Sequence, residues 1–263
     1  MIGVSCIIPV FNDADNLARA VDSCFTQGDN VEVIVVDDCS TDNSFQTAQE
    51  LAASSSGRIR AFQNTQNSGP GFSRNHGAFH SRGAFVCFLD SDDCHLKGFV
   101  DQCVSLLMHQ PESAAVKTLI DIVSSDGSSP LAKDDPRYSV VVASYPCNMM
   151  VRKEVFLVMG GFPTDARFRG PLAGEDDAFI QTLGRLFRSV KLVQQALVRH
   201  HDRPGSHLEL FLSRSRVEDG KIIIDEDDPT LKVREVVSAT QDYFVQAQCN
   251  LRSLMRCATF NGE

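Results

Sequence analysis

Acidic side chains cluster at three points of this sequence. Asp37 and Asp38 follow a β-branched run, and residues 90–93, Asp-Ser-Asp-Asp, follow the apolar residues 85–89. Residues 175–177, Glu-Asp-Asp, stand in front of a helical pattern. Carboxylates gathered in this way are candidates for metal binding and for proton transfer.

The spacing of Asp90 and Asp92 suits a cation. Alternate residues of an extended segment point to the same side, so these two carboxylates can face one hard divalent cation. A cation held by few protein ligands keeps open positions that can bridge to substrate phosphates. The simplest alternative is an acidic surface turn, but a position directly after a buried strand favours a binding site.

The three consecutive acids exceed what a helix N-terminus needs. A single Asp176 or Asp177 would cap the helix and complement its dipole. A general base that accepts a hydroxyl proton is expected to be a carboxylate at such a loop-to-helix junction. Farther along the chain, Arg199, His200 and His201 follow another apolar run. Taken alone, two such histidines are more often ordinary surface or core residues than metal ligands.

Composition limits the class of partner. The chain has 263 residues, 43% of them hydrophobic and 22% charged, which is typical of a globular protein. Its formal net charge of -9 argues against nucleic acid as a partner, because phosphate backbones are bound by clustered Lys and Arg. An acidic protein can still bind a phosphorylated small molecule when a divalent cation lies between them.

The nine cysteines show no CxxC pair and no Cys/His spacing typical of zinc sites. Several lie in apolar runs, where free Cys behaves as a small hydrophobe. This pattern favours a reducing, cytoplasmic location over a secreted disulfide scaffold. No basic segment precedes the first apolar run, so a signal peptide is not expected. No stretch of about 18 apolar residues predicts a membrane span.

Short apolar runs alternate with helical periods in the first half of the chain. This alternation predicts βαβ units and a mostly parallel sheet with helices on both faces. The expected strands are residues 4–10, 31–36, 59–62 and 85–89, and the expected helices begin near Leu17, Phe45, Phe72 and Val100. Ligands of such sheets bind outside the carboxyl ends of the strands, where the first two acidic groups lie.

The second half is less regular. Residues 124–136 are rich in Ser, Gly, Pro and Asp and predict a loop, and residues 139–144 predict a strand. Helices are expected at 153–159 and 177–187. Residues 233–255 form an amphipathic pattern, for which packing on the chain's own domain is the favoured use. Homodimer formation and peripheral contact with a membrane are the alternatives.

Other phosphate-binding and cation-binding motifs fit less well. An EF-hand loop would need an Asp or Asn at Cys94 and a glycine at His95. Gly69-Pro70-Gly71 lacks the third glycine of a dinucleotide fingerprint, and the chain has no Gly-x-x-x-x-Gly-Lys-Ser/Thr loop. A phosphatase or phosphotransferase built on the Asp-Ser-Asp motif stays open.

Taken together, seven motifs in order over residues 5–206 resemble the family-two glycosyltransferases of the GT-A fold. The motifs are VSCIIPVFN at 4–12, VVDDCSTD at 35–42, NSGPGFSRNHG at 67–77, FLDSDD at 88–93, the segment 148–162 ending in MGGF, GEDD at 174–177, and RHH at 199–201. Cys39 stands where the family usually has glycine. The chain contains no Trp and therefore lacks the Q/R-x-x-R-W motif of the processive synthases.

The resemblance implies a Rossmann-like, mostly parallel central sheet flanked by helices. It implies one domain at 1–206, with a nucleotide-sugar-binding half at 1–110 and an acceptor-side half at 111–206. Residues 207–263 are then expected to be a helical C-terminal extension packed on that domain.

The resemblance also implies a set of site residues. Those for the nucleotide-sugar are Pro9, Val10, Phe11, Asn12, Asp38, Asn67, Gly71, Arg74, Asp90 and Ser91. Asp92 and His201 would hold Mn²⁺ or Mg²⁺, as oxygen and imidazole ligands. Asp176 is the preferred general base, with Glu175 and Asp177 as weaker candidates.

The implied reaction is a non-processive, inverting transfer of a hexosyl or hexosaminyl group from a nucleoside-diphosphate donor, with UDP favoured. The acceptor would be a hydroxyl group, such as that of a saccharide in a cell-surface polysaccharide or glycoconjugate. A non-catalytic nucleotide-sugar-binding protein is the remaining alternative.

Overall fold

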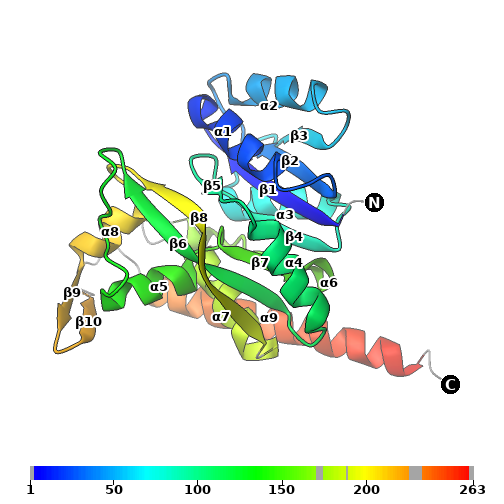
Figure 1. Cartoon of the computed structure of the whole chain (residues 1–263). Coiled ribbons are helices and arrows are strands. Elements are labelled where there is room, and N and C mark those ends of the chain that lie inside the picture. The colour runs from blue at the N-terminus through cyan, green and yellow to red at the C-terminus, as the bar shows by residue number, and fades with distance from the viewer. Residues whose placement is uncertain (1–2, 170–173, 188, 225–232, 261–263) are drawn as a thin grey trace.

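The computed structural model describes residues 3–169, 174–187, 189–224 and 233–260. Most of the strands in these ranges form one sheet in the order β3-β2-β1-β4-β7-β6-β8-β5 (Figure 1). Its strands are β1 (Val4–Val10), β2 (Val31–Asp37), β3 (Ile59–Gln63), β4 (Phe85–Phe88), β5 (Cys94–His95), β6 (Ala115–Ser124), β7 (Met149–Arg152) and β8 (Val190–Asp202). Only β7 and β5 run against the direction shared by the other strands of this sheet.

Helices cover both faces of the sheet, which is the predicted fold class. The first seven are α1 (Ala14–Phe25), α2 (Ser44–Ala53), α3 (Pro70–His80), α4 (Phe99–His109), α5 (Pro136–Ser144), α6 (Lys153–Met159) and α7 (Glu175–Phe187), with a 3-10 turn, η1, at Ala166–Phe168. Cys6 and Ile8 of β1 pack with α1, α2 and α4, whereas Ile7 packs with α3, α6 and α7. β1 and β2 are therefore buried along their whole length, as expected of central parallel strands.

The strands expected at 4–10, 31–36, 59–62 and 85–89 are confirmed within one residue at their ends. The strand expected at 139–144 is wrong, because these residues belong to α5. Pro136 occupies the first turn of α5, and the Asp135 side chain caps it by accepting from the Arg137 backbone N–H. Tyr138 and Val142 then pack on Ile120 and Leu208. Tertiary packing and the cap thus override the β propensity of three consecutive valines.

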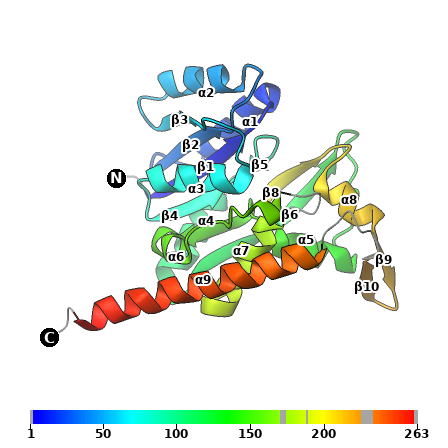
Figure 2. The same cartoon turned by 180° about the vertical axis from the view of Figure 1, so that it is seen from behind.

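The last part of the chain adds α8 (His207–Ser213), the antiparallel pair β9 (Ser215–Glu218) and β10 (Lys221–Ile224), and the long α9 (Val233–Phe260). α9 packs against α6 and α7, passing in front of α7 in Figure 2, and its C-terminal turns extend past both helices. Ala239 and Ala247 are buried there, and the Tyr243 hydroxyl donates to the Gly161 carbonyl at 2.5 Å. Among the described helices, none is long and apolar enough to cross a membrane.

The contact between α3 and the sheet depends on Gly77. A Cβ atom at this position would lie 2.5 Å from Ile7 Cγ2 and 3.2 Å from Val36 Cγ2. Gly77→Ala should therefore lower the free energy of unfolding by about 1–3 kcal/mol through overpacking. Urea unfolding would measure the change.

Gly184 in α7 is the matched control, because a Cβ there meets nothing within 4 Å. Gly184→Ala should raise the free energy of unfolding by about 0.5–1 kcal/mol, the usual gain of Ala over Gly in a helix. Equal effects of the two substitutions would contradict the close packing of α3 on β1.

Candidate functional site

A cavity of about 1080 Å³ opens at the carboxyl ends of β1, β2 and β4 and reaches toward α5 and α8. Most of the residues predicted from sequence line it: Pro9, Val10, Phe11, Asp38, Asn67, Gly71, Asp90, Ser91, Asp92, Glu175, Asp176 and His201. Asn12 and Arg74 do not line it. The sheet edge thus brings together acidic groups that lie up to 139 positions apart, from Asp38 to Asp177.

Arg74 lies beneath the cavity floor and joins its two sides. Its guanidinium donates from Nη1 to Asp176 Oδ1 at 2.6 Å and from Nη2 to Asp90 Oδ1 at 2.7 Å. The side chain is 3% exposed. Burial alone would lower the pKa of Arg74, but Asp176 and Asp90 outweigh this effect and raise it. A permanently charged guanidinium therefore holds the predicted base at a fixed place beside the metal motif.

Asp176 is the most perturbed carboxyl of the cavity. Burial raises its pKa to about 8, against the opposing attraction of Arg74 and with added repulsion from Glu175 and Asp90. A carboxyl group with a pKa near neutrality can both accept and release a proton at working pH. Glu175 is more deeply buried, and its Oε2 has no hydrogen-bond partner in the described structure.

Asp38 is held by the loop that follows β3. Its Oδ1 accepts from the Asn64 side chain at 2.7 Å and from the Ser68 N–H at 2.9 Å, and its Oδ2 accepts from the Gly69 N–H at 2.7 Å. Asp38 is 3% exposed. These bonds leave one acceptor position on Oδ2. The carboxylate thus fixes the loop that forms this cavity wall.

Two other predicted residues fasten loops. Asn12 adopts a positive φ of 51°, and its Oδ1 accepts from the Thr41 N–H at 2.8 Å. Ser91 donates to Asp13 Oδ2 at 2.6 Å. Cys39, which replaces the usual glycine, also has a positive φ, 63°, a region that favours glycine. The turn after β2 keeps its conformation despite this side chain.

Gly71 and Asn75 bring α3 against Glu175 and the segment at 160–162. A Cβ on Gly71 would approach Glu175 Cγ to 3.2 Å, a tight contact that would require this acid to shift, so glycine lets Glu175 lie close to α3. The Asn75 side chain donates to the Phe162 carbonyl at 2.8 Å and accepts from the Phe162 N–H at 2.7 Å. The motif around Arg74 is thereby locked to the Gly-Gly-Phe turn at 160–162.

Asp92 and His201, the two metal ligands predicted from the sequence, both line the cavity. Burial raises the pKa of Asp92 to about 6, and repulsion by Asp93 and Asp90 adds to the shift. His201 Nδ1 is buried without a hydrogen-bond partner among the described residues, and both side chains line the same cavity. Carboxylate oxygen with imidazole nitrogen suits a divalent cation such as Mn²⁺, whose charge would relieve this repulsion.

A cation already lies near Asp92. Arg203 Nη2 is 3.1 Å from Asp92 Oδ2, and the Arg203 side chain is 64% exposed. Sequence reasoning did not identify this arginine. An exposed side chain of this kind can leave the carboxylate at little cost.

Asp93, the last residue of the acidic group 90–93, is a second residue to which the sequence assigned no role. It is fully buried and accepts from the Tyr145 hydroxyl and from the His201 N–H at 2.9 Å. His200 Nδ1 lies 3.1 Å away. Burial lowers the pKa of His200, but Asp93 outweighs this effect and raises it. Asp93 thus ties the loop after β4 to β8, and the preceding Asp-Ser-Asp gave the only sequence signal.

Lys117 of β6 is the third missed residue. It is 5% exposed, and its Nζ donates to the Tyr145 carbonyl at 2.7 Å. Burial lowers its pKa to about 7, against the attraction of Asp176 and Asp177. A lysine inside the apolar run at 115–123 was the signal that could have identified it.

Comparison with known proteins identifies related sequences. The family model described as glycosyl transferase family 2 matches residues 5–161. The succinoglycan biosynthesis protein ExoO of Rhizobium meliloti (strain 1021) is 37% identical over 127 residues, which are 48% of this chain and 35% of that protein. The chain therefore matches about a third of the length of this relative.

Solved structures show the same fold. S. aureus TarS 1-349 in complex with UDP-GlcNAc superposes with a TM-score of 0.63 and 22% identity, over 79% of this chain and 61% of that one. The mannosyltransferase PcManGT from Pyrobaculum calidifontis, in complex with GDP-Man and Mn²⁺, gives a TM-score of 0.61 and 18% identity, over 96% of this chain and 75% of that one.

The buried Lys117 predicts a pH dependence of stability. Between its native pKa of about 7 and the ordinary value near 10.4, the unfolded chain binds a proton that the native protein has lost. The free energy of unfolding should therefore rise with pH in this window. Lys117→Met should remove that rise, as measured by urea unfolding at several pH values.

Lys191→Met is the control, because it replaces an exposed lysine on β8. It should leave the pH dependence of the wild type unchanged. An unchanged pH dependence in Lys117→Met as well would show that Lys117 is not the titrating group.

Proposed function

The chain belongs to glycosyl transferase family 2, and on this premise we propose that it is a non-processive, inverting glycosyltransferase with a GT-A fold. It moves one sugar from a nucleoside-diphosphate donor to a hydroxyl group of an acceptor. The observation that carries this proposal is the buried Arg74 fork, which holds Asp176 and Asp90 in one cavity with Asp92.

The donor lies along the carboxyl ends of β1, β2 and β4. Phe11, 48% exposed at the cavity wall, offers an aromatic face to the nucleobase, and the free position on Asp38 Oδ2 accepts from an imide N–H. Asn67 and Gly71 border the same wall. A bound Mn²⁺ or Mg²⁺, held by Asp92 and His201, would offset the charge of the leaving diphosphate.

Transfer is a single displacement. Asp176 accepts the proton of the acceptor hydroxyl while that oxygen forms a bond to the anomeric carbon. The bond from the anomeric carbon to the diphosphate oxygen breaks, and its electron pair leaves with the diphosphate. Arg74 does not touch the reacting atoms in this scheme; it positions Asp176 and keeps Asp90 ionised.

The relatives support a choice of substrates. UDP-GlcNAc in the TarS complex favours a UDP-sugar as donor. The mannosyltransferase complex contains GDP-Man instead, so the nucleobase of the donor has to be determined by experiment. The ExoO name supports a growing surface polysaccharide as the acceptor. The family match includes Asp90 and Asp92, so the phosphatase alternative has no supporting observation.

Titration of UDP, GDP and dTDP, each with and without Mn²⁺, tests the donor site. UDP should bind most tightly, and its affinity should fall at least ~10-fold without Mn²⁺ or in Asp92→Ala. Isothermal calorimetry would measure both losses. Asp126→Ala, an exposed acid outside the cavity, should bind like the wild type. Failure of every nucleotide to bind would refute the donor site.

Asp176→Asn tests the base. The amide keeps an oxygen that can accept from Arg74 but cannot take up a proton, so transfer should fall about 10²–10⁴-fold while donor binding persists. Asp177→Asn, one residue along the same helix, is the matched control and should retain most activity. Near-normal transfer by Asp176→Asn would exclude Asp176 as the base.

The raised pKa of Asp176 sets the pH dependence of transfer. The base works only when ionised, so kcat/KM should rise about tenfold per pH unit below that pKa and level off above about 8. Donor affinity measured over the same range separates chemistry from binding. A kcat/KM that does not change with pH below about 8 would be inconsistent with this role.

A further inference from the structure

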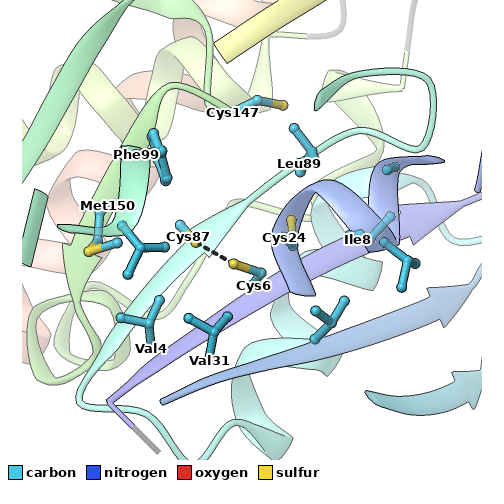
Figure 3. Close-up of a cluster of buried hydrophobic side chains, with 14 of the residues drawn as sticks. Val4, Cys6, Ile8, Cys24, Val31, Cys87, Leu89, Phe99, Cys147 and Met150 are labelled. Atoms are coloured by element: carbon cyan, nitrogen blue, oxygen red, sulfur yellow. Dashed lines mark hydrogen bonds between the residues drawn. The ribbon is translucent and has the colours of Figure 1, made fainter. Parts of the chain in front are cut away.

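A group of sulfur and nitrogen atoms lies in the core, away from the cavity. Cys6 of β1, Cys24 of α1 and His95 of β5 bring their ligand atoms within 4.8 Å of one another. Cys87 of β4 adds another thiol, with its Sγ 3.1 Å from Cys6 Sγ (Figure 3). The three cysteines are fully buried and His95 is 3% exposed. The proposed reaction uses none of these four residues.

The hydrogen bonds of His95 fix its tautomer. Its Nε2 lies 3.1 Å from the Cys147 carbonyl oxygen, which can only accept, so Nε2 carries the hydrogen. In the neutral ring Nδ1 then has a free lone pair, and it lies 3.4 Å from Cys24 Sγ. A histidine that donates one N–H to a backbone carbonyl and presents its other nitrogen to thiols has the usual arrangement of a metal ligand.

We propose that Cys6, Cys24, Cys87 and His95 form a binding site for one Zn²⁺ ion. Zinc prefers four thiolate and imidazole ligands in a tetrahedron, with bonds of about 2.3 Å to sulfur and about 2.0–2.1 Å to nitrogen. Such a tetrahedron separates two sulfurs by about 3.8 Å and sulfur from nitrogen by about 3.5 Å. The distance of 3.4 Å between Cys24 Sγ and His95 Nδ1 already matches the expected sulfur–nitrogen separation. Cys6 Sγ and Cys87 Sγ must move apart by less than 1 Å, and Cys87 Sγ, which lies outside the 4.8 Å group of Cys6, Cys24 and His95, must also move toward the other two ligands.

Burial explains why these thiols need a cation in order to ionise. In the surrounding apolar core, desolvation raises the pKa of Cys24 and of Cys87. The metal-free protein therefore keeps neutral thiols joined by weak hydrogen bonds. Zinc replaces the thiol protons, and three thiolates with a neutral imidazole leave a net charge of -1 around it. Because the site has no exposed surface, the ion enters as the chain folds.

The position of the site links it to the cavity. It joins β1, α1 and β4 to β5, which begins directly after Asp93. The backbone N–H of His95 also donates to Ser23 Oγ of α1 at 3.1 Å. A bound ion would hold the strand that follows the carboxylates Asp90 and Asp92. This soft-ligand site differs in chemistry from the oxygen-rich site at the cavity, so the two can be probed separately.

The test uses the full chain with any affinity tag removed. The protein is refolded with Co²⁺, which substitutes for zinc and gives a thiolate-to-cobalt charge-transfer band only when sulfur is a ligand. The Asp92→Ala background removes the carboxylate site. One equivalent of tightly held metal and the band should appear in this background and in the added Cys103→Ala control, a buried thiol of the same core.

Cys24→Ala and His95→Gln should each lose the band and weaken metal binding at least ~10-fold. Circular dichroism would verify that each variant is folded. Two different ligand changes keep the test decisive if one variant fails to fold. No band in the Asp92→Ala background, or an equal band in both ligand variants, would overturn the zinc site.

Discussion

The buried fork of Arg74 is the interaction on which the cavity depends. One guanidinium reaches Asp90 after β4 and Asp176 at the start of α7, and so connects α3 to both elements. Loss of one partner from such a buried group leaves an uncompensated charge, which typically costs about 3–5 kcal/mol. Gly71 and Asn75 allow this connection, because the first leaves room for Glu175 and the second fixes the backbone of Phe162.

Electrostatic repulsion is the second constraint on the site. Asp90, Asp92 and Asp93 lie close together, and the protein neutralises them unequally. Arg74 pairs with Asp90, and His200 with Asp93, while among the described side chains the Asp92 carboxylate pairs with the exposed Arg203. The least compensated of the three carboxylates is therefore Asp92, which lines the cavity together with Asp90. A divalent cation there would offset this charge and would let a chain of net charge -9 bind a diphosphate.

The rest of the fold keeps these groups in place. Central strands buried on both faces fix the ends from which Asp38 and Asp90 emerge. Asp38, Asn12 and Ser91 then fasten the loops by hydrogen bonds to neighbouring loops. The apolar core beneath carries the sulfur and imidazole cluster, which joins β1 and β4 to the strand after the metal motif.

The strands of the first half and the fold class could be predicted from the sequence, and most of the site residues predicted from it do line the cavity. Hydrophobic periodicity and the position of a residue at the end of a strand are local properties, which can be read from short stretches of sequence. The three-dimensional structure was needed to establish that residues 139–144 are helical, that Arg74 is buried between two acids, and that Asp93 and Lys117 are buried. It alone gathered Cys6, Cys24, Cys87 and His95, which show no zinc-like spacing along the chain. Burial and ion pairing depend on contacts between residues that are distant in sequence, so local sequence patterns do not predict them.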